Sequence, residues 1–333
     1  MSQRLRTGRA LVTGAGGFIG SHLVERLVAG GTRVRAFVRY TSRGNLGLLA
    51  QLPAEALASL EIVHGDLRDS SAILKAMEDC EEVYHLGALI AIPYSYVHPR
   101  EVVETNVIGT LNVLEAARRT KPRRVIVTST SEVYGTSRSE KISEAHPLQG
   151  QSPYSASKIG ADKLAESYYR AFDVPVVTVR PFNTYGPRQS ARAIIPTIIT
   201  QALALSTVSI GAFKPTRDFT YVTDTVAGFL AAAAAPPDRV LGREINLGAD
   251  DEIAVDDLAR RIMALVGRNL ELVCDSGRLR PEKSEVERLH SDNRLAKELL
   301  GWSPTVSLTE GLRRTIDWIR DNLQFYRPGF YEV

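Results

Sequence analysis

Cysteine is scarce in this sequence. The 333 residues include two cysteines, Cys80 and Cys274, which are too few and too far apart to form a disulfide scaffold or a metal-binding cluster. We therefore expect no metal site, and we expect both thiols to be buried as small hydrophobic side chains.

Long apolar runs and a strong charge of one sign are also missing. No stretch approaches the roughly 18 consecutive apolar residues that a membrane span needs, and residues 1–9 lack the apolar core of a signal peptide. The net charge is only +3, and the basic residues are scattered rather than gathered in a stripe that would bind nucleic acid. These absences predict a cytoplasmic protein that binds neither membranes nor nucleic acid.

The composition is that of a globular protein. Hydrophobic residues make up 44% of the chain and charged residues 24%. The chain is long for a single compact core. We therefore expect one large domain or two closely packed domains.

A glycine-rich loop follows the first predicted strand, residues 10–13, and precedes a predicted helix, residues 21–29. In dinucleotide-binding folds the first glycine of such a loop makes a tight turn, the second lets backbone amides approach a pyrophosphate, and the third lets the helix pack on the strand. The position between strand and helix therefore predicts a dinucleotide site. Its expected contacts in the loop are Gly14, Gly17, Phe18, Ile19 and Gly20.

An acidic residue is missing at the position where NAD-binding proteins usually carry one. The second predicted strand, residues 33–38, ends at Arg39, and Arg43 follows shortly after. An acidic side chain here binds the ribose 2′-hydroxyl of NAD, whereas arginine suits the 2′-phosphate of NADP. The two arginines therefore favour NADP, and NAD is the alternative if they are solvated loop residues.

Predicted strands and helices alternate along the chain. Strands are expected at residues 33–38, 61–64, 82–86, 125–129 and 243–247. This alternation predicts an α/β fold, a Rossmann-like doubly wound parallel sheet with a smaller α/β substrate-binding domain. Ligands of such sheets bind at the carboxyl ends of the strands. Further expected cofactor contacts at these ends are Asp66, which is placed to meet the adenine, Leu67, Leu86 and Ala88.

The segment from residue 129 to residue 158 contains the candidate catalytic groups. Tyr154 and Lys158 lie one turn apart on a predicted helix, whose start is marked by Ser152 as a cap and by Pro153. A phenol has an ordinary pKa of about 10, and a nearby ammonium group favours the phenolate and lowers that pKa. The pair predicts a general base, although the same spacing also occurs in ordinary exposed pairs.

Several motifs together resemble the extended short-chain dehydrogenase/reductase family of nucleotide-sugar enzymes. The likeness covers essentially the whole chain and rests on Thr13–Gly20, His85–Ala88, Asn106, Tyr154 with Lys158, Arg180–Pro187, Arg217–Phe219 and Leu300–Pro304. The run from Thr130 to Gly135 resembles the signature of 4,6-dehydratases and uronate decarboxylases. Stretches 92–96 and 280–286 are similar to those of bacterial dehydratases that act on nucleotide-linked N-acetylglucosamine.

The resemblance implies the chemistry of a 4,6-dehydratase. Such an enzyme moves a hydride from sugar C4 to the nicotinamide, eliminates water across C5 and C6, and returns the hydride to C6. Tyr154 would take the C4 hydroxyl proton, Lys158 would lower the Tyr154 pKa and hold the nicotinamide ribose, and Thr130 would hydrogen-bond the same hydroxyl. Glu132 would remove the C5 proton. Tyr154 and Lys158 are therefore also expected cofactor contacts. Ser131 stands where deoxythymidine-sugar dehydratases carry an aspartate acid. Glu132 or a water would then protonate the C6 hydroxyl.

The resemblance also implies where the sugar nucleotide binds. Arginine suits its diphosphate because the planar guanidinium binds two oxygens at once. The expected substrate contacts are Tyr94, Asn183, Arg188, Gln189, Arg217 and Arg280. Two alternatives stay open, since Arg217 could simply pair with Asp218 and Arg288, in the same polar stretch as Arg280, could equally be a solvated residue.

We expect two domains, because the composition changes after Arg180. Residues 1–180 and 218–248 form the predicted dinucleotide-binding domain, and residues 181–217 and 249–333 form the predicted nucleotide-sugar-binding domain. The ligands are expected in the cleft between them. The resemblance further implies a homodimer formed by helices near residues 102–118 and 154–169.

Other activities remain open on the same residues. A nucleotide-uronate decarboxylase shares the Thr-Ser-Glu run and needs a cation for the substrate carboxylate, and a 4-epimerase would leave C6 unchanged. A non-catalytic NADP-binding regulator would be expected to lack Tyr154 or Lys158, and the chain has both.

Overall fold

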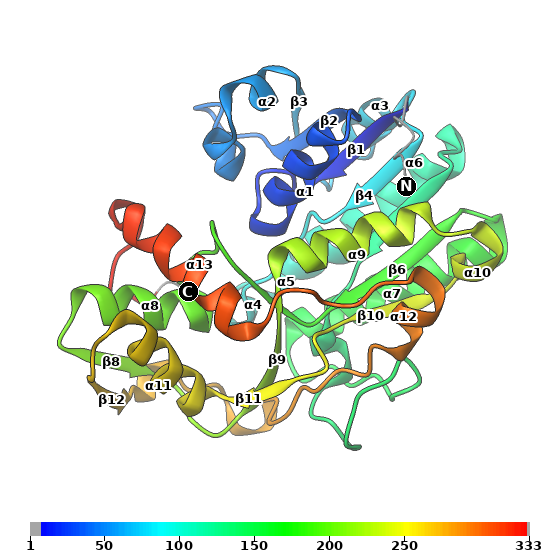
Figure 1. Ribbon diagram of the computed structural model, residues 1–333. Helices are drawn as coiled ribbons and strands as arrows, with labels where there is room; N and C mark the ends of the chain where they lie inside the picture. Colours follow the sequence, from blue (N-terminus) through cyan, green and yellow to red (C-terminus); the bar gives the residue numbers. More distant parts are fainter. Residues whose placement is uncertain (1–7, 332–333) are drawn as a thin grey trace.

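A parallel sheet of seven strands runs through the computed structural model, which describes residues 8–331 (Figure 1). The strands are β1 (Arg9–Thr13), β2 (Arg33–Arg39), β3 (Glu61–Gly65), β4 (Glu82–His85), β5 (Arg124–Thr128), β6 (Val176–Pro181) and β10 (Glu244–Leu247). They are arranged in the order β10-β6-β5-β4-β1-β2-β3, and each neighbouring pair is parallel. The predicted Rossmann-like sheet is confirmed, including the return of the chain through β10.

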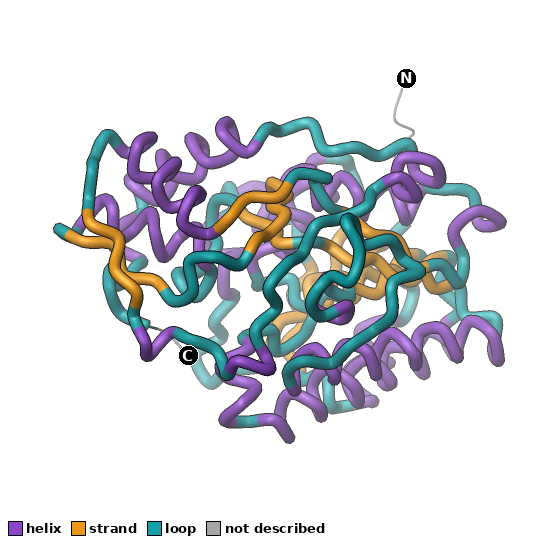
Figure 2. The backbone as a smooth tube through the Cα atoms, turned by 90° about the horizontal axis from the view of Figure 1, so that it is seen from below, coloured by secondary structure: helices purple, strands orange, loops and turns teal. Residues whose placement is uncertain are grey.

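The sheet is covered on both faces, as its continuously apolar strands require. In β5, Ile126 packs into one hydrophobic cluster, and Val125 and Val127 pack into another, because successive side chains of a strand point to opposite faces. One face is covered by α1 (Phe18–Ala29) and α9 (Val222–Ala234), and the other by α3 (Ser70–Met77), α6 (Gly109–Thr120) and α7 (Pro153–Phe172). Seen from below, strands lie in the middle of the molecule and helices around them (Figure 2).

The part of the fold that is predicted to bind the nucleotide sugar, called the substrate part below, adds two small sheets. One contains β7 (Asn183–Tyr185), β9 (Thr216–Tyr221) and β11 (Glu252–Ala254), and the other pairs β8 (Thr207–Ile210) with β12 (Glu271–Cys274). In Figure 1 the second sheet is grouped with α8 (Ile194–Ala204), α11 (Val255–Val266) and α13 (Leu308–Asp321), to the left of the main sheet. The predicted domain boundary between residues 217 and 218 falls inside β9.

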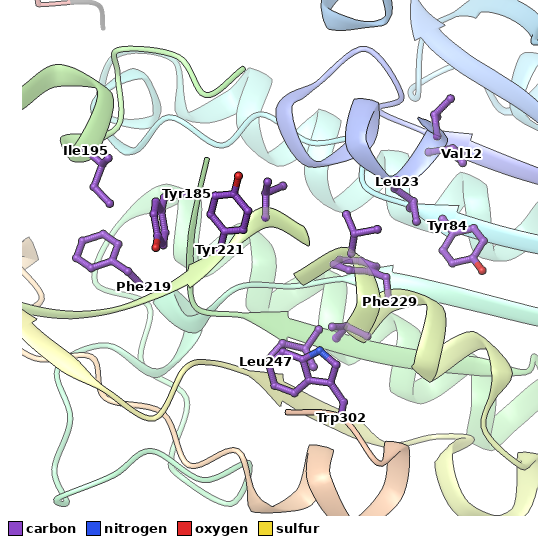
Figure 3. Packing of buried hydrophobic residues seen from close by; sticks show 14 of the residues in the cluster. Val12, Leu23, Tyr84, Tyr185, Ile195, Phe219, Tyr221, Phe229, Leu247 and Trp302 are labelled. Carbon is purple, nitrogen blue, oxygen red and sulfur yellow. The ribbon is translucent and has the colours of Figure 1, made fainter. Parts of the chain in front are cut away.

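One hydrophobic cluster joins the two parts. It extends from Val12 and Leu23, beside the main sheet, through Phe229 and Leu247 to Trp302, and also contains Tyr185, Ile195, Phe219 and Tyr221 of the substrate part (Figure 3). The indole of Trp302 donates a hydrogen bond to the Asp224 carbonyl at 2.9 Å. The substrate part is therefore fixed against the sheet by continuous packing.

Short elements complete the fold. They are α2 (Ala54–Ala58), α4 (Ile92–Val97), α5 (Pro99–Val103), α10 (Pro237–Val240), α12 (Arg294–Leu300), the π-helical turn η2 (Glu104–Ile108), and the 3-10 turns η1 (Gly47–Gln51), η3 (Ser131–Tyr134), η4 (Ser276–Arg278), η5 (Glu282–Ser284) and η6 (Leu323–Phe325). Among residues 8–331, no helix combines the length and apolar character that crossing a membrane requires.

The helix predicted at residues 102–118 is interrupted by η2. A π turn often marks a functional segment, and here it holds the buried Asn106. The Asn106 amide accepts from the Leu89 backbone N–H at 2.8 Å and donates to the Leu89 carbonyl and to Ser157, each at 2.9 Å. The turn thereby ties the segment after β4 to α7.

The prediction for the cysteines is half right. Cys80 is buried, whereas Cys274 is exposed. Cys274 ends β12, an edge strand that pairs only with β8 and is largely exposed. Within the described range, no group of three His, Cys, Asp or Glu residues is arranged to hold a metal ion.

Candidate active site

A cavity of about 1040 Å³ extends from the glycine-rich loop to the substrate part of the fold. Its wall includes the residues that directly follow β1, β4, β5 and β6, at the carboxyl ends of the parallel strands, where ligands of such sheets bind. Most of the predicted site residues line it: Gly14, Gly17, Phe18, Ile19, Gly20, Arg39, Leu86, Ala88, Thr130, Ser131, Glu132, Tyr154, Asn183, Arg188, Gln189, Arg217 and Arg280.

The glycine-rich loop has the geometry of a dinucleotide cradle. Gly14 has a left-handed φ of 67°, which glycine adopts without strain. A Cβ on Gly20 would lie 2.2 Å from the Gly14 carbonyl oxygen, so only glycine allows α1 to pack this closely on the loop. The backbone amides of the first turn of α1 lie along the cavity, where they suit a pyrophosphate. The residues present therefore fit a bound dinucleotide.

Four of the predicted cofactor residues, Arg43, Asp66, Leu67 and Lys158, do not line the cavity. Arg43 is exposed on the loop after β2. The Asp66 carboxylate accepts from Arg68 at 2.7 and 2.9 Å, and the Arg68 hydrogen bond lowers the pKa of Asp66. Leu67 packs behind the cavity against Gly87 and Gly109. Their predicted contacts with the cofactor stay predictions.

The segment from Asn45 to Leu48, at the start of η1, packs on the glycine-rich loop. This contact was not predicted from the sequence. The Leu48 N–H donates to the Gly16 carbonyl at 2.9 Å, and Asn45, Leu46 and Gly47 line the cavity. The sequence signal for this turn was the pair of glycines Gly44 and Gly47, since glycine is common in turns that need a left-handed backbone. Both have a φ of 60° in the structure.

The catalytic candidates come from the turn after β5 and the first turn of α7. Thr130 caps η3 by accepting a hydrogen bond from the Glu132 N–H at 3.2 Å. Ser152 and Ser155 form a capping box around Pro153, which confirms the predicted start of α7. This start places Tyr154 on the cavity wall next to Thr130 and Glu132. Both neighbours affect the pKa of the Tyr154 phenol.

The pKa of Tyr154 differs from the sequence-based expectation. Burial raises the pKa of this phenol, the Thr130 hydrogen bond partly offsets the rise, and the Glu132 charge adds to it. Lys158 lies behind the wall and donates to the Thr128 carbonyl at 2.6 Å. Burial lowers the pKa of Lys158, and the Asp162 charge opposes this. We predicted that Lys158 lowers the pKa of Tyr154. In the protein without ligands this pKa is raised instead, because desolvation of the phenol is the largest effect.

A buried polar network supports this wall from behind. The Asp162 carboxylate, one turn beyond Lys158 on α7, accepts from Ser129 at 2.8 Å and from Arg180 at 3.1 Å. Arg180 also donates to the Tyr134 hydroxyl at 3.0 Å. The network links β5, β6, η3 and α7 at the edge of the cavity. The sequence motifs include Arg180 but gave no indication of Asp162.

Alternating charges gather on the substrate side of the cavity. Arg217 is buried and donates to Glu285 at 3.1 Å, so its expected alternative partner, Asp218, is not the one it uses. The Arg280 Nη1 atom is 3.7 Å from Glu285 and 4.0 Å from Glu132, and it is buried with no hydrogen-bond partner among the described residues. Glu285, which belongs to the polar stretch around Arg280, contacts both guanidinium groups.

The remaining substrate candidates differ in position. Asn183 donates to the Asp218 carbonyl at 3.3 Å, and Arg188 pairs with Glu25 at 2.7 Å. The other predicted residue on this wall, Gln189, donates to the Thr184 carbonyl at 2.8 Å. Tyr94 is not on the wall. Its hydroxyl donates to Glu101 at 2.5 Å, and its predicted contact with the substrate stays a prediction.

The outer wall of the cavity is formed by one side chain from the loop before α8 and by several from the last 60 residues, and it was missed by sequence reasoning. These side chains are Arg192, Arg278, Trp318, Phe325, Tyr326 and Tyr331. The Tyr326 hydroxyl donates to the Gln189 carbonyl at 2.8 Å, which connects this wall to the loop after β7. The four aromatic residues within 325–331 were the local sequence signal.

Comparison with known proteins agrees with this geometry. Residues 11–315 match the family described as GDP-mannose 4,6 dehydratase. The chain is 34% identical to a UDP-glucose 4-epimerase of Mycolicibacterium smegmatis, over 95% of this chain and 100% of the relative. It is 32% identical to a dTDP-glucose 4,6-dehydratase of Xanthomonas campestris, over 94% and 93%. It is 31% identical to UDP-glucuronic acid decarboxylase 1 of Xenopus tropicalis, over 97% and 75%.

A solved structure shows the same fold with ligands bound. The dTDP-glucose 4,6-dehydratase DesIV of Streptomyces venezuelae, described with NAD and TYD bound, superposes with a TM-score of 0.85 at 31% identity and covers 96% of this chain and 99% of its own. The family match and these relatives span nearly all of the described fold. The chain therefore belongs to the GDP-mannose 4,6 dehydratase family of extended short-chain dehydrogenases/reductases.

Proposed function

We propose that the protein is a nucleotide-sugar 4,6-dehydratase. The observation that carries this proposal is the position of Glu132, which lines the same cavity as Tyr154 and the glycine-rich loop. Oxidation at C4 requires only a base such as Tyr154, whereas loss of water across C5 and C6 requires a second acid–base group beside the sugar. Glu132 is the carboxylate in reach of that role.

The protein groups divide the proton transfers between them. Tyr154 receives the proton of the C4 hydroxyl, and Thr130 positions that hydroxyl. Lys158 donates a hydrogen bond to the Thr128 carbonyl behind Tyr154 and is the side chain that would hold the nicotinamide ribose. When bound, a nicotinamide dinucleotide would supply, in its oxidised form, an acceptor for the C4 hydride and a positive ring charge that favours the Tyr154 phenolate, and, in its reduced form, a donor for the return of that hydride to C6.

Glu132 carries both proton transfers of the elimination step. It takes the C5 proton, which is acidic once C4 is a ketone, and gives that proton to the departing C6 hydroxyl, which leaves as water. Ser131 is almost fully buried, at 2% exposure, and serine is a poor acid at neutral pH. Glu132, reprotonated from solvent, finally gives a proton to C5, and Tyr154 releases to solvent the proton it took from the C4 hydroxyl, so the sugar loses one water and the cofactor is unchanged.

The substrate class that fits the outer cavity is a sugar linked to a nucleoside diphosphate. Arg217 and Arg280 are positioned between Glu132 and the outer wall, and their guanidinium groups suit a diphosphate. The cofactor in this proposal is a nicotinamide dinucleotide. Arg39, on the cavity wall, is the side chain that would meet the 2′-phosphate of NADP.

We further propose a homodimer. Val103 of α5 and Ile108 of η2 expose 44% and 42% of their surface, on segments that pack beside α7. A second copy of this region would cover both side chains. Ile108→Glu should convert a dimer to a monomer in analytical ultracentrifugation, and an unchanged sedimentation coefficient would contradict the proposed interface.

A uronate decarboxylase is the second candidate. The observation in its favour is Arg280, whose unpartnered Nη1 atom lies in the cavity region near Glu132 and could hold a substrate carboxylate. An epimerase would use Tyr154 and Lys158 but would leave Glu132 without a role, which makes that activity the weaker fit.

The test is incubation of the purified protein with dTDP-glucose, GDP-mannose, UDP-N-acetylglucosamine and UDP-glucuronate. Mass spectrometry would detect loss of water from a neutral sugar if the protein is a dehydratase, loss of carbon dioxide from UDP-glucuronate if it is a decarboxylase, and unchanged mass with an altered sugar if it is an epimerase. In Glu132→Gln, we expect substrate to reduce the cofactor while dehydration falls at least about 100-fold. Full dehydration by this variant would exclude Glu132 from the mechanism.

A further inference from the structure

An acidic group that is distant in sequence lies beside Arg39, at one end of the candidate dinucleotide site. The sequence has no acidic residue directly after β2, yet Glu101 of α5 reaches this place. Its Oε1 atom lies 3.5 Å from Nη2 of Arg39, although 62 positions separate the two residues. Folding therefore brings a carboxylate next to the arginine from which NADP was predicted.

Glu101 is held at this position by a second contact. Its other oxygen, Oε2, accepts the Tyr94 hydroxyl at 2.5 Å. The Tyr94 hydrogen bond lowers the pKa of Glu101, with a further contribution from Arg39, so the carboxylate carries a full negative charge at neutral pH. The Glu101 side chain is 28% exposed. It is oriented by protein contacts on both oxygens.

Two other arginines near this corner are also paired with carboxylates. Arg68 binds the Asp66 carboxylate and lies 3.9 Å from Glu104, and Arg100 pairs with Glu104 at 2.8 Å. A 2′-phosphate of NADP carries close to two negative charges at neutral pH. It would have to displace Glu101 from Arg39 and would be repelled by that carboxylate. A neutral ribose 2′-hydroxyl meets no such repulsion, and a carboxylate accepts its hydrogen bond.

We propose that Glu101 is a cofactor-specificity residue that makes the protein prefer NAD to NADP by neutralising Arg39. This inference rests on the proposal that the site binds a nicotinamide dinucleotide. It reverses the preference expected from Arg39 considered without its partner. The missing acidic residue of the second strand is replaced in space by one from α5.

The test is direct binding, which requires no sugar substrate. The full-length protein, freed of bound nucleotide, would be titrated with NADH and with NADPH. The Kd for each would be measured from nicotinamide fluorescence. We expect the wild type to bind NADH more tightly. In Glu101→Gln, the ratio of NADPH to NADH affinity should rise about fivefold or more, which corresponds to the loss of one partly exposed charge contact.

Two matched variants make the result specific. Glu104→Gln removes an equal charge three positions away, from a residue that pairs with Arg100 rather than Arg39, and should leave the ratio unchanged. In an Arg39→Met background, Glu101→Gln should shift the ratio much less, because the pair no longer exists.

A wild type that prefers NADPH, an unchanged ratio in Glu101→Gln, or an equal shift in Glu104→Gln would overturn the inference. Each of these results would leave the 4,6-dehydratase proposal standing. Conversely, failure to dehydrate any sugar nucleotide would leave the measured binding ratio, and the role of Glu101, untouched.

Discussion

The guanidinium of Arg280 lies between two carboxylates, 4.0 Å from Glu132 and 3.7 Å from Glu285. Glu132 follows β5 of the main sheet, and Arg280 lies in the C-terminal segment after η4. Substrate part and sheet therefore meet at the candidate base. Because Nη1 of Arg280 is buried without a hydrogen-bond partner among residues 8–331, it is available to an oxygen of the substrate.

Arg280→Met should weaken substrate binding more than catalysis. Loss of a charged hydrogen bond to the diphosphate should raise KM about tenfold or more, with a smaller change in kcat, as measured by initial rates on the substrate found in the sugar-nucleotide panel. Arg288→Met is the control, since Arg288 is bound to Glu252 at 2.9 and 3.1 Å and does not line the cavity. Equal effects of the two variants would remove Arg280 from the binding site.

Asp162→Asn should move the pH dependence of kcat to lower pH. The Asp162 charge raises the pKa of Lys158 and that of Tyr154, so its removal lowers both. Tyr154 then ionises at lower pH and Lys158 loses its proton at lower pH. The rising and the falling limb of the pH profile of kcat should therefore both shift to lower pH, by about one pH unit.

The network around Asp162 requires a fold control for this experiment. Arg180 loses one partner in Asp162→Asn but retains the Tyr134 hydroxyl, and circular dichroism would verify the fold. Asp173→Asn, at the C-terminal cap of α7, removes an equal charge from the other end of the helix and should leave the profile in place. A profile unmoved by Asp162→Asn would show that this carboxylate is only structural.

Gly20→Ala should weaken dinucleotide binding. The added Cβ would lie 2.2 Å from the Gly14 carbonyl oxygen, so α1 or the loop must shift, at a cost of about 1–3 kcal/mol in unfolding free energy. We expect the Kd for NADH to rise at least about tenfold. Gly30→Ala, at the other end of α1, meets its nearest backbone atom at 3.3 Å and should bind NADH normally. Normal binding by Gly20→Ala would contradict the cradle geometry.

His85 should make the protein acid-sensitive. Its Nδ1 and Nε2 atoms lie 2.8 and 3.0 Å from the hydroxyls of Thr13 and Thr110. Thr110 donates its own proton to the Asn106 carbonyl, so it accepts from Nε2–H, and Nδ1 accepts from Thr13. This arrangement needs a neutral ring. Burial accordingly lowers the pKa of His85 to about 3 from its ordinary value of 6.5.

The sign of the effect follows from this depressed pKa. The unfolded chain binds a proton on His85 below pH 6.5 and the folded protein does not, so stability is full above pH 6.5 and decreases as the pH falls. Between pH 6.5 and 5 the loss should be about 2 kcal/mol. Urea unfolding at pH 7.5 and 5.0 should show that His85→Gln reduces the difference between the two pH values, whereas the exposed His64→Gln does not. An undiminished difference in His85→Gln would assign the acid sensitivity to other groups, such as His22.

Local patterns predicted a large part of the molecule correctly. Strand and helix alternation, the glycine-rich loop and the capped start of α7 depend on contacts within a few residues, and the spacing of glycine, apolar and capping residues expresses those contacts directly. The positions of Gly14, Gly20 and Tyr154 on the cavity wall followed from the same patterns, because the strands that precede them end at a common edge.

Tertiary packing decided the rest. The sequence by itself determined the parallel sheet and the Tyr154–Lys158 spacing, since both are set by short-range periodicity. Only the folded structure paired Glu101 with Arg39, Glu285 with Arg217, and the Tyr94 hydroxyl with Glu101. It also reversed the expected pKa shift of Tyr154, because the desolvation of a phenol depends on every segment packed around it, and no spacing along the chain records that burial.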